Sequence, residues 1–205
     1  MTPAEIALIV LIVAGVVIGV LSWLARRLDA LHKRVINSLA VLDAQLVRRA
    51  ELAMKLASSG AVDDASQVII AQAAWEAGVQ GERLVGADPR REAPSLGQLA
   101  EMTTTRGLDR SDVETELTIA LRGALGERED IDSISHHPQG GQILADLQAT
   151  CYRVQLARRF HNDAVEAVHL LRRTWIVKAC HLAGRAALPH TFDMDDDVFS
   201  LGEQQ

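Results

Sequence analysis

The sequence predicts an all-α protein, in which an N-terminal transmembrane helix continues into an antiparallel bundle of about four helices, two of them long. Apolar residues make up 48% of the 205 residues but aromatic residues only 3%, so Ala, Leu and Val dominate the apolar content. No run of alternating β-branched residues is bounded by a hairpin turn signal. Apolar residues instead recur every three or four positions over long stretches, which is the period of an amphipathic helix.

The N-terminal segment predicts the membrane helix. Residues Ile6 to Leu24 carry no charge, and as a helix they span about 28 Å, close to the hydrocarbon thickness of a bilayer. Thr2 is placed to cap this helix, with Pro3 at its first position and Glu5 completing a capping box. A cleavable signal peptide is the alternative, but no Lys or Arg precedes the apolar run and no small-x-small cleavage site follows it.

The charges beside this segment predict its orientation. Trp23 lies where an interfacial aromatic residue belongs, and Arg26 and Arg27 are placed to reach lipid headgroups. Lys33 and Arg34 add positive charge on the same side. The positive-inside rule therefore predicts a single-pass protein with its N-terminus outside and its C-terminal domain in the cytoplasm. The predicted divisions are an anchor over 1–27, a bundle domain over 28–187 and an acidic tail over 188–205.

A first long helix is predicted to continue from the membrane segment to Ser59, because neither Gly nor Pro interrupts residues 21–59. Its apolar positions repeat with a period of about eleven residues per three turns, which gives a nearly straight seam, unlike a heptad coiled coil. Polar residues such as Arg34 and Glu51 occupy the opposite face. The predicted seam comprises Leu28, Leu31, Val35, Leu39, Leu42, Leu46, Ala50, Ala53 and Ala57.

The middle of the chain predicts shorter helices between loops. Asp63 and Asp64 open a helix that runs to about Leu84. Ser111 and Glu114 form a capping box that opens another helix, to about Leu125. Loop chemistry predicts the connections 85–110, around a short helix at 95–102, and 131–141. The expected buried stripe of the helix after Asp63 comprises Val68, Ala71, Trp75 and Val79.

The last helix is predicted to be the longest, from Gln142 to about Ala187. Both cysteines, Cys151 and Cys180, are expected to be buried in it as small hydrophobic residues. The tail that follows is acidic over 193–197, and we expect it to be solvated and disordered. The expected stripe comprises Ile143, Leu147, Cys151, Val154, Ala157, Phe160, Ala164, Val168, Leu171, Trp175, Ala179 and Leu182.

Two dense motifs resemble those of the LemA family of bacterial membrane proteins. Residues 34–52 are similar to the family's Arg-x-x-Val-x-Asn followed by Asp-x-Gln-Leu-x-Arg-Arg, and residues 157–165 to its Ala-Arg-x-x-Tyr-Asn-x-x-Val, with His161 in the tyrosine place. The tail over 188–193 resembles the family's Pro-x-x-Phe-Glu ending. A proline that the family often places after the Arg-Arg segment is absent here. The resemblance implies a divergent member, a helical bundle anchored in a bacterial cell membrane, and it supplies no biochemical activity.

No set of side chains predicts catalysis or a cofactor. Glu166 and His169 have the Glu-x-x-His spacing of di-iron bundles, but such a site needs a second Glu-x-x-His, which the chain lacks. His136 and His137 lie in the second predicted loop without a carboxylate or cysteine at ligand spacing. The net charge of −6 opposes nucleic acid as the main partner. We therefore predict a protein that is not an enzyme and binds no cofactor, metal or nucleic acid.

Two polar strips are the candidate partner surface, because the family resemblance is concentrated on them. They pair with each other inside the bundle, bind a partner, or form ordinary solvated surface, and the sequence leaves these three readings open. The predicted function is a membrane-anchored scaffold or assembly factor that binds other proteins. The alternative is a stalk or coiled-coil subunit of a larger membrane complex, and a homo-oligomer is compatible with either. The strips comprise Asp43, Gln45, Arg48 and Arg49 on the first helix and Arg158, Arg159, Asn162 and Asp163 on the last.

Overall fold

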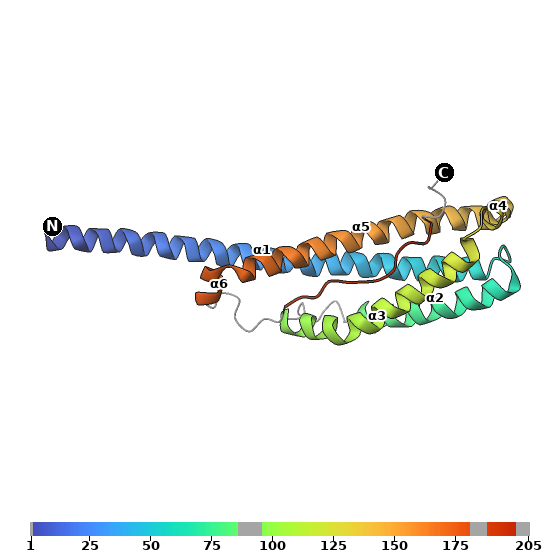
Figure 1. The fold of residues 1–205 in the computed structure, drawn as a ribbon, viewed down its shortest axis with the longest axis horizontal. Coiled ribbons are helices and arrows are strands. Elements are labelled where there is room, and N and C mark those ends of the chain that lie inside the picture. The colour runs from blue at the N-terminus through green and yellow to red at the C-terminus, as the bar shows by residue number, and fades with distance from the viewer. Residues whose placement is uncertain (1, 86–95, 181–187, 200–205) are drawn as a thin grey trace.

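The computed structural model describes residues 2–85, 96–180 and 188–199, with side chains described outside 80–85 and 96–109. Every regular element in this part of the chain is a helix, so the all-α prediction is confirmed (Figure 1). The helices are α1 (Pro3–Ala57), α2 (Asp64–Val85), α3 (Leu96–Leu125), α4 (Arg128–His136), α5 (Gly140–Arg173) and α6 (Trp175–Ala179).

Helix α1 is a single unbroken helix of 55 residues, as the absence of Gly and Pro after residue 20 predicts. It begins at the predicted capping box, in which the hydroxyl of Thr2 accepts from the backbone N–H of Glu5 and the Glu5 carboxylate accepts from the backbone N–H of Thr2. It ends where Gly60 adopts a left-handed backbone with φ of +71°. One helix therefore connects the apolar N-terminal segment to the bundle.

The bundle is built around the second half of α1. Helix α5 lies antiparallel along α1, α2 packs on another side of it, and α3 packs on α2 (Figure 1). The predicted seam of α1 is confirmed: Leu31 and Leu39 are half-buried, and the other seven seam residues are buried. Core side chains of α2, α3 and α5 pack around Ala50, Ala53 and Ala57, because small apolar residues allow the helices to approach closely.

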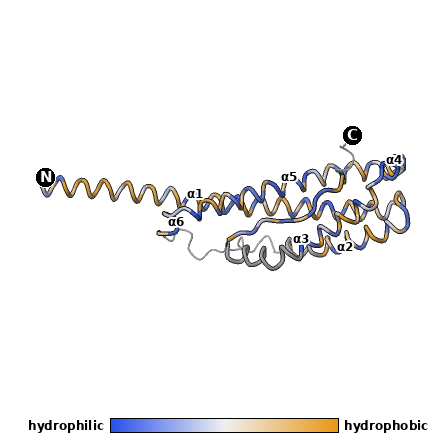
Figure 2. Tube along the Cα trace, in the orientation of Figure 1, coloured by the Kyte–Doolittle hydropathy of each residue, from blue (hydrophilic) through white to orange (hydrophobic). Residues whose placement is uncertain are grey.

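The apolar start of α1 projects beyond the other helices. Figure 2 shows a mainly hydrophobic stretch from the N-terminus to the point where α5 and α6 lie beside α1. Residues 2–20 are exposed, and the first buried side chains of the helix are Leu24 and Leu28. The structure therefore contains one long apolar N-terminal helix whose first part has no protein around it.

The predicted stripe of α2 is wrong at Val68 and Trp75, whereas Ala71 and Val79 are half-buried. Val68 and Trp75 are 68% and 63% exposed, whereas the residues that face α1 are Ile70, Ala74 and Ala77. The alanines explain this orientation, since small side chains let α2 pack closely against the alanines of α1. Val68, Ile69 and Trp75 are left on the outside of the bundle.

The predicted loop is also wrong over 103–110, because α3 is continuous from Leu96 to Leu125, whereas the short helix predicted at 95–102 is confirmed from residue 96 onwards. The predicted capping box does not start a helix, since Ser111 and Glu114 both lie inside α3. Their side chains have tertiary partners instead: Ser111 contacts the tail and Glu114 binds two arginines. Helix propensity is a weak prior, and the threonines and glycine before Ser111 each cost at most about 1 kcal/mol in a helix.

Two further boundaries differ from the prediction. The predicted loop at 131–141 contains most of α4, in which Ile134 is buried against the core. The predicted last helix ends at Arg173, where Thr174 is extended, and α6 follows separately. Phe160, Trp175 and Cys180 are exposed, contrary to expectation, and His161 is buried next to Phe160. The part of the predicted helix over 181–187 lies outside the described residues.

The acidic tail is not solvated and disordered over its described part, residues 188–199. It runs as an extended segment between α3 and α5 (Figure 1), and Phe192, Met194 and Val198 are buried. Phe192 and Met194 share a core cluster with Leu42 and Leu46 of α1. The prediction was based on the aspartates, which were expected to stay hydrated. The apolar residues that alternate with them contact the bundle and hold the segment in place.

Candidate functional site

The two predicted polar strips do not form one surface, because their residues lie in three environments. Asp43 and Arg49 are buried against α3, and Arg158 and Asn162 contact the tail. Asp43 and Arg158 do not pair with each other, although α1 and α5 are antiparallel: Asp43 faces Arg110, and Arg158 binds Asp196. Of the remaining strip residues, Gln45 is half-buried, and Arg48, Arg159 and Asp163 are exposed.

A buried charge network joins α1 to α3. Nη2 of Arg49 donates to Oε2 of Glu114 at 2.6 Å and to the Glu114 carbonyl oxygen at 2.8 Å, and its Nη1 donates to the hydroxyl of Thr118 at 3.0 Å. Nε of Arg110 donates to the other carboxylate oxygen of Glu114 at 2.7 Å. Arg110 also lies 3.7 Å from Asp43, close enough for attraction but too far for a hydrogen bond. Two positive and two negative side chains therefore alternate inside the bundle.

This network is sensitive to the loss of any one member. Burial raises the pKa of Asp43, the nearby Arg110 lowers it, and Glu114 raises it. Nε of Arg49 and both Nη atoms of Arg110 have no hydrogen-bond partner among the described residues. Buried ion pairs are costly to desolvate, and removing one partner leaves an uncompensated charge worth about 3–5 kcal/mol. The network joins α3 to α1, and its four charged side chains are buried in the bundle.

The second environment is the contact between α5 and the tail. Nε of Arg158 donates to Oδ2 of Asp196 at 2.7 Å. The Asn162 amide pairs with the backbone of Phe192, donating to its carbonyl oxygen at 3.1 Å and accepting from its N–H at 2.9 Å. On the other side of the tail, Nη2 of Arg122 on α3 lies 2.8 Å from Oδ2 of Asp195. The Arg122 hydrogen bond lowers the pKa of Asp195.

An exposed apolar surface lies apart from both strips, on α2 and α3. We define the outer face as Val68, Ile69 and Trp75 of α2 with Ile119 of α3, four large apolar residues that are each more than half exposed. Single exposed apolar residues are ordinary, but a group of them on two adjacent helices is typical of an interaction site. The sequence pattern contained this signal, because Val68 and Trp75 were predicted to face a protein interior.

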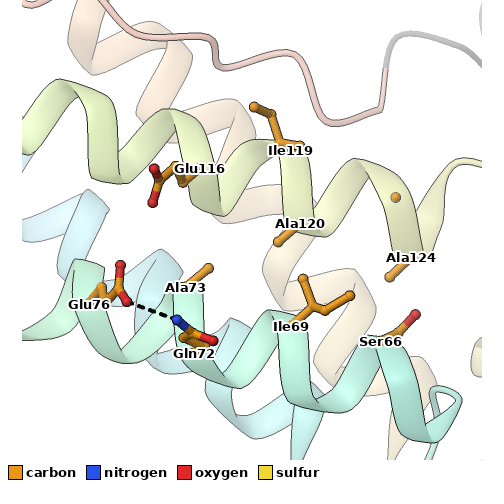
Figure 3. A pocket seen from close by; sticks show the side chains of 10 residues that line it. Ser66, Ile69, Gln72, Ala73, Glu76, Glu116, Ile119, Ala120 and Ala124 are labelled. Carbon is orange, nitrogen blue, oxygen red and sulfur yellow. Dashed lines mark hydrogen bonds between the residues drawn. The ribbon is translucent and has the colours of Figure 1, made fainter.

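A groove of about 520 Å³ lies between α2 and α3, and of the outer face Ile69 and Ile119 line it (Figure 3). Ile69 and Ala73 of α2 and Ala120 and Ala124 of α3 form its apolar lining. Glu76 and Glu116 give one end of it negative charge, and Gln72 donates to Glu76 at 3.2 Å. The small side chains leave room for the side chains of a partner helix.

A second, smaller groove of about 410 Å³ lies between α1 and α5. Val41 and the exposed Phe160 contribute apolar surface, and Lys33 and Arg34 contribute positive charge. Its lining residues on α1 lie between Ala30 and Val41, in the part of the bundle nearer to the projecting apolar segment. The two grooves therefore differ in charge and in position along the bundle.

The predicted anchor residues lie at the end of the projecting apolar segment. The Arg27 guanidinium stands 5.2 Å from the centre of the Trp23 ring, a cation–π distance, and Nε of Arg26 donates to the Ser22 carbonyl oxygen at 3.2 Å. Both arginine head groups contact the preceding helical turn, at the end of the apolar segment. Helix α1 is long and apolar enough to cross a membrane, and none of its most apolar window is buried.

The described residues contain no group of three or more His, Cys, Asp or Glu side chains arranged to hold a metal ion. His169, one of the pair with di-iron spacing, donates from Nε2 to the Pro189 carbonyl oxygen at 2.8 Å. Burial raises the pKa of the Cys151 thiol to about 11, which disfavours the nucleophilic thiolate. His169 therefore contacts the tail, and Cys151 forms part of the hydrophobic core.

Sequence reasoning missed the partners of the strips. Arg110 and Glu114 fell in or next to a predicted loop, and Arg122 was not singled out. The residues of α3 that contact the tail lie at helical spacing, three or four apart, which is a signal that sequence could have offered. They are Ser111, Thr115, Thr118 and Arg122.

Comparison of the chain with family models, with curated proteins and with solved structures found no match. The resemblance to the LemA family therefore stays a prediction from two motifs. The structure adds what those motifs contact: the first contributes Asp43 and Arg49 to the buried network, and the second contributes Arg158 and Asn162 to the tail contact.

Proposed function

We propose that the protein is a membrane-anchored helical scaffold or assembly factor that binds other proteins and catalyses no reaction. The observation that carries this proposal is the outer face, in which Val68, Ile69, Trp75 and Ile119 are exposed and two of them, Ile69 and Ile119, line a groove. Burying such a face is worth roughly 25 cal/mol per Å² of apolar area. A soluble bundle gains nothing from presenting these residues to water, so the face favours a binding role.

The partner that fits this face is an amphipathic helix with basic residues beside its apolar stripe. The groove is bounded by two helices and lined by alanines, which suits a third helix packing into it. Glu76 and Glu116 at one end complement Lys or Arg side chains of that helix. The stem of a long basic side chain would cover the apolar rim while its charge reaches the carboxylates.

The projecting part of α1 supports the membrane anchor. Its exposed apolar surface is the length of a bilayer's hydrocarbon core, and Trp23, Arg26 and Arg27 follow it directly. The cleavable-signal alternative is disfavoured because α1 continues without a break and packs into the bundle from Leu24 onwards. The charge beside the segment favours a cytoplasmic bundle and an outside N-terminus, in a bacterial cell membrane if the LemA resemblance holds.

A stalk subunit of a larger complex is the second reading. Its support is the length of α1, 55 residues in one helix. A stalk needs long helices that extend away from the membrane, whereas α2, α3 and α5 fold back along α1. The scaffold reading is therefore favoured over the stalk.

The test compares partners captured in native membranes. Full-length protein is crosslinked in membranes and the attached proteins are identified by mass spectrometry. We expect Trp75→Glu with Ile119→Glu to remove a defined set of partners, because a charge in an apolar contact is costly to bury. Glu76→Lys with Glu116→Lys should weaken the same partners by repelling their basic residues.

The matched control is Tyr152→Glu, a change to an equally exposed aromatic residue on α5. It should keep the partner set that the outer-face variants lose. Circular dichroism must show equal helix content and melting in all variants. If every variant captures the same proteins as wild type, the outer face is not the binding surface and the proposal loses its main support.

A further inference from the structure

The segment between α3 and α5 occupies its groove in the manner of a bound peptide. Residues 189–197 are extended, and side chains of both helices hydrogen-bond to their backbone. From α3, Ser111 donates to the Asp193 carbonyl oxygen, and Thr118 donates to that of Asp195 at 2.7 Å. The hydroxyl of Thr115 accepts from the Asp195 N–H at 3.2 Å.

Helix α5 supplies the opposite wall. Gln155 donates to the Asp196 carbonyl oxygen at 3.0 Å, and His169 donates to that of Pro189 at 2.8 Å. Asn162 makes the paired contact with the Phe192 backbone described above. Backbone contacts of this kind do not depend on which side chains the extended segment carries, and they are the usual source of affinity for extended peptides.

Side-chain contacts give the groove a preference. Phe192 and Met194 enter an apolar floor formed by Leu42, Leu46, Val154 and Ala157. Asp195 and Asp196 are adjacent in sequence but bind opposite walls, Arg122 on α3 and Arg158 on α5. Successive residues of an extended chain point to opposite sides, so two consecutive carboxylates match two arginines facing each other across the groove.

We propose that this groove is a recognition site for an extended acidic segment of a partner protein, and that the chain's own tail occupies it as an intramolecular competitor. The partner segment would carry apolar residues at alternate positions followed by two consecutive acidic residues, the chemistry of residues 192–196. With the tail displaced, the groove presents Arg122 and Arg158 above an apolar floor, which complements that segment in charge and in shape. This surface is separate from the outer face, and the proposal stands whether or not the outer face binds a helix.

The tail is suited to be displaced. It contributes no regular structure, and its ion pair between Arg122 and Asp195 is about one third exposed on both sides. Its attachment to the bundle raises its effective concentration to about the millimolar range, so a partner must bind more tightly than the tail or the tail must be weakened. Segments that bind the groove more weakly than the tail are therefore excluded, whereas a segment that binds it more tightly displaces the tail.

The experiment uses the full-length chain in detergent micelles and a fluorescein-labelled synthetic peptide with the sequence of residues 188–199. The release variant is Phe192→Ser with Asp196→Asn, which weakens the tail and changes no residue of the groove. Fluorescence anisotropy should show that the release variant binds the peptide at least tenfold more tightly than wild type does. A scrambled peptide of the same composition should not bind either protein.

The groove is tested in the release variant. Arg158→Gln should weaken peptide binding at least tenfold, because it removes the partner of the second carboxylate. Arg159→Gln, the exposed neighbour on the same helix, is the matched control and should leave binding unchanged. A milder release variant, Asp195→Asn with Asp196→Asn, keeps the apolar contacts of the tail and serves if the first variant loses helix content.

Three results would overturn the proposal. Equal peptide binding by wild type and both release variants would show that the tail is a fixed part of the fold. Equal binding of the scrambled peptide would show that the groove has no sequence preference. If two differently tagged wild-type copies co-purify, and do so only when both tails are intact, the occupant is the tail of a second copy and the proposed partner segment is excluded.

Discussion

Nη2 of Arg49 on α1 lies 2.6 Å from Oε2 of Glu114 on α3, and both side chains are almost completely buried. This ion pair connects two helices that are far apart in the sequence. The motif around Asp43 and Arg49 therefore contributes a buried interaction to the folded bundle. Arg49 lies in the interior, whereas Arg48 beside it pairs with Glu51 at the surface.

Breaking this pair should destabilise the bundle strongly. Arg49→Ala removes one of the two arginines that bind the buried Glu114 carboxylate. We therefore expect a loss of about 3–5 kcal/mol in the free energy of unfolding. Arg48→Ala removes only an exposed pair and should change it by about 1 kcal/mol or less. Urea denaturation of the full-length protein in micelles, followed by circular dichroism, measures both. Equal losses for the two variants would contradict the buried position of Arg49.

The orientation of α2 gives a second prediction. Ile70→Ala should cost about 2–5 kcal/mol, because Ile70 is fully buried against the core. Trp75→Ala should change stability by only about 0.5 kcal/mol, because its side chain is 63% exposed. The stripe expected from sequence predicts the reverse order. The same denaturation measurement decides which face of α2 is inside.

The buried His161 predicts a dependence of stability on pH. Its Nδ1 lies 3.1 Å from the Ser38 hydroxyl, and burial lowers its pKa below the usual value. The unfolded chain therefore takes up a proton at a higher pH than the folded one, so stability falls as pH drops below about 6.5 until the folded pKa is reached. The loss is at most about 1.4 kcal/mol per pH unit for one such group.

His161→Gln should remove the part of this slope that His161 contributes. His32 has the same sign of effect, because burial and then the nearby Arg172 lower its pKa. The double variant His32→Gln with His161→Gln should therefore have the flattest profile. Unfolding midpoints in urea between pH 7.5 and pH 5 measure the slopes. Parallel profiles for wild type and the double variant would show that neither histidine is responsible.

The apolar segment predicts how the protein behaves in cell fractionation. It should stay in the membrane pellet after high-salt and carbonate washes and leave only with detergent, because burial of an uncharged span is much stronger than surface electrostatics. A chain lacking residues 1–22 tests the cause and keeps Leu24, where packing in the bundle begins. That shortened chain should appear in the soluble fraction, whereas release of the full chain by carbonate would argue against a spanning anchor.

The sequence predicted those parts of the fold that depend on local periodicity. The seam of α1 was predictable because each of its apolar residues contacts the bundle, so burial follows the repeat directly. The face of α2 was not, because two apolar stripes compete there and the alanine stripe packs more closely. The helix over 103–110 was missed because loop-forming residues were weighed without their tertiary setting.

The candidate site was harder to predict, for the same physical reason. The strips were found through resemblance, but a polar residue on a helix has the same sequence signal whether it faces water, a buried counter-ion or an extended tail. Arg49 and Arg158 differ in burial and in their partners, Glu114 and Asp196, and those partners lie far away in the sequence. Charge pairs between residues so far apart in the sequence produce no periodic pattern from which they could be predicted.

The continuity of α1 has a mechanical consequence if its first part spans a bilayer. Residues 25–57 form a rod of roughly 50 Å, rigidly joined to the spanning part. Transmembrane helices tilt by about 20° on average, and the tilt adjusts to hydrophobic thickness. Such a tilt moves the far end of the rod sideways by roughly 17 Å. The lipid environment would then set where the outer face of the bundle stands above the membrane, with no joint in between to absorb the change.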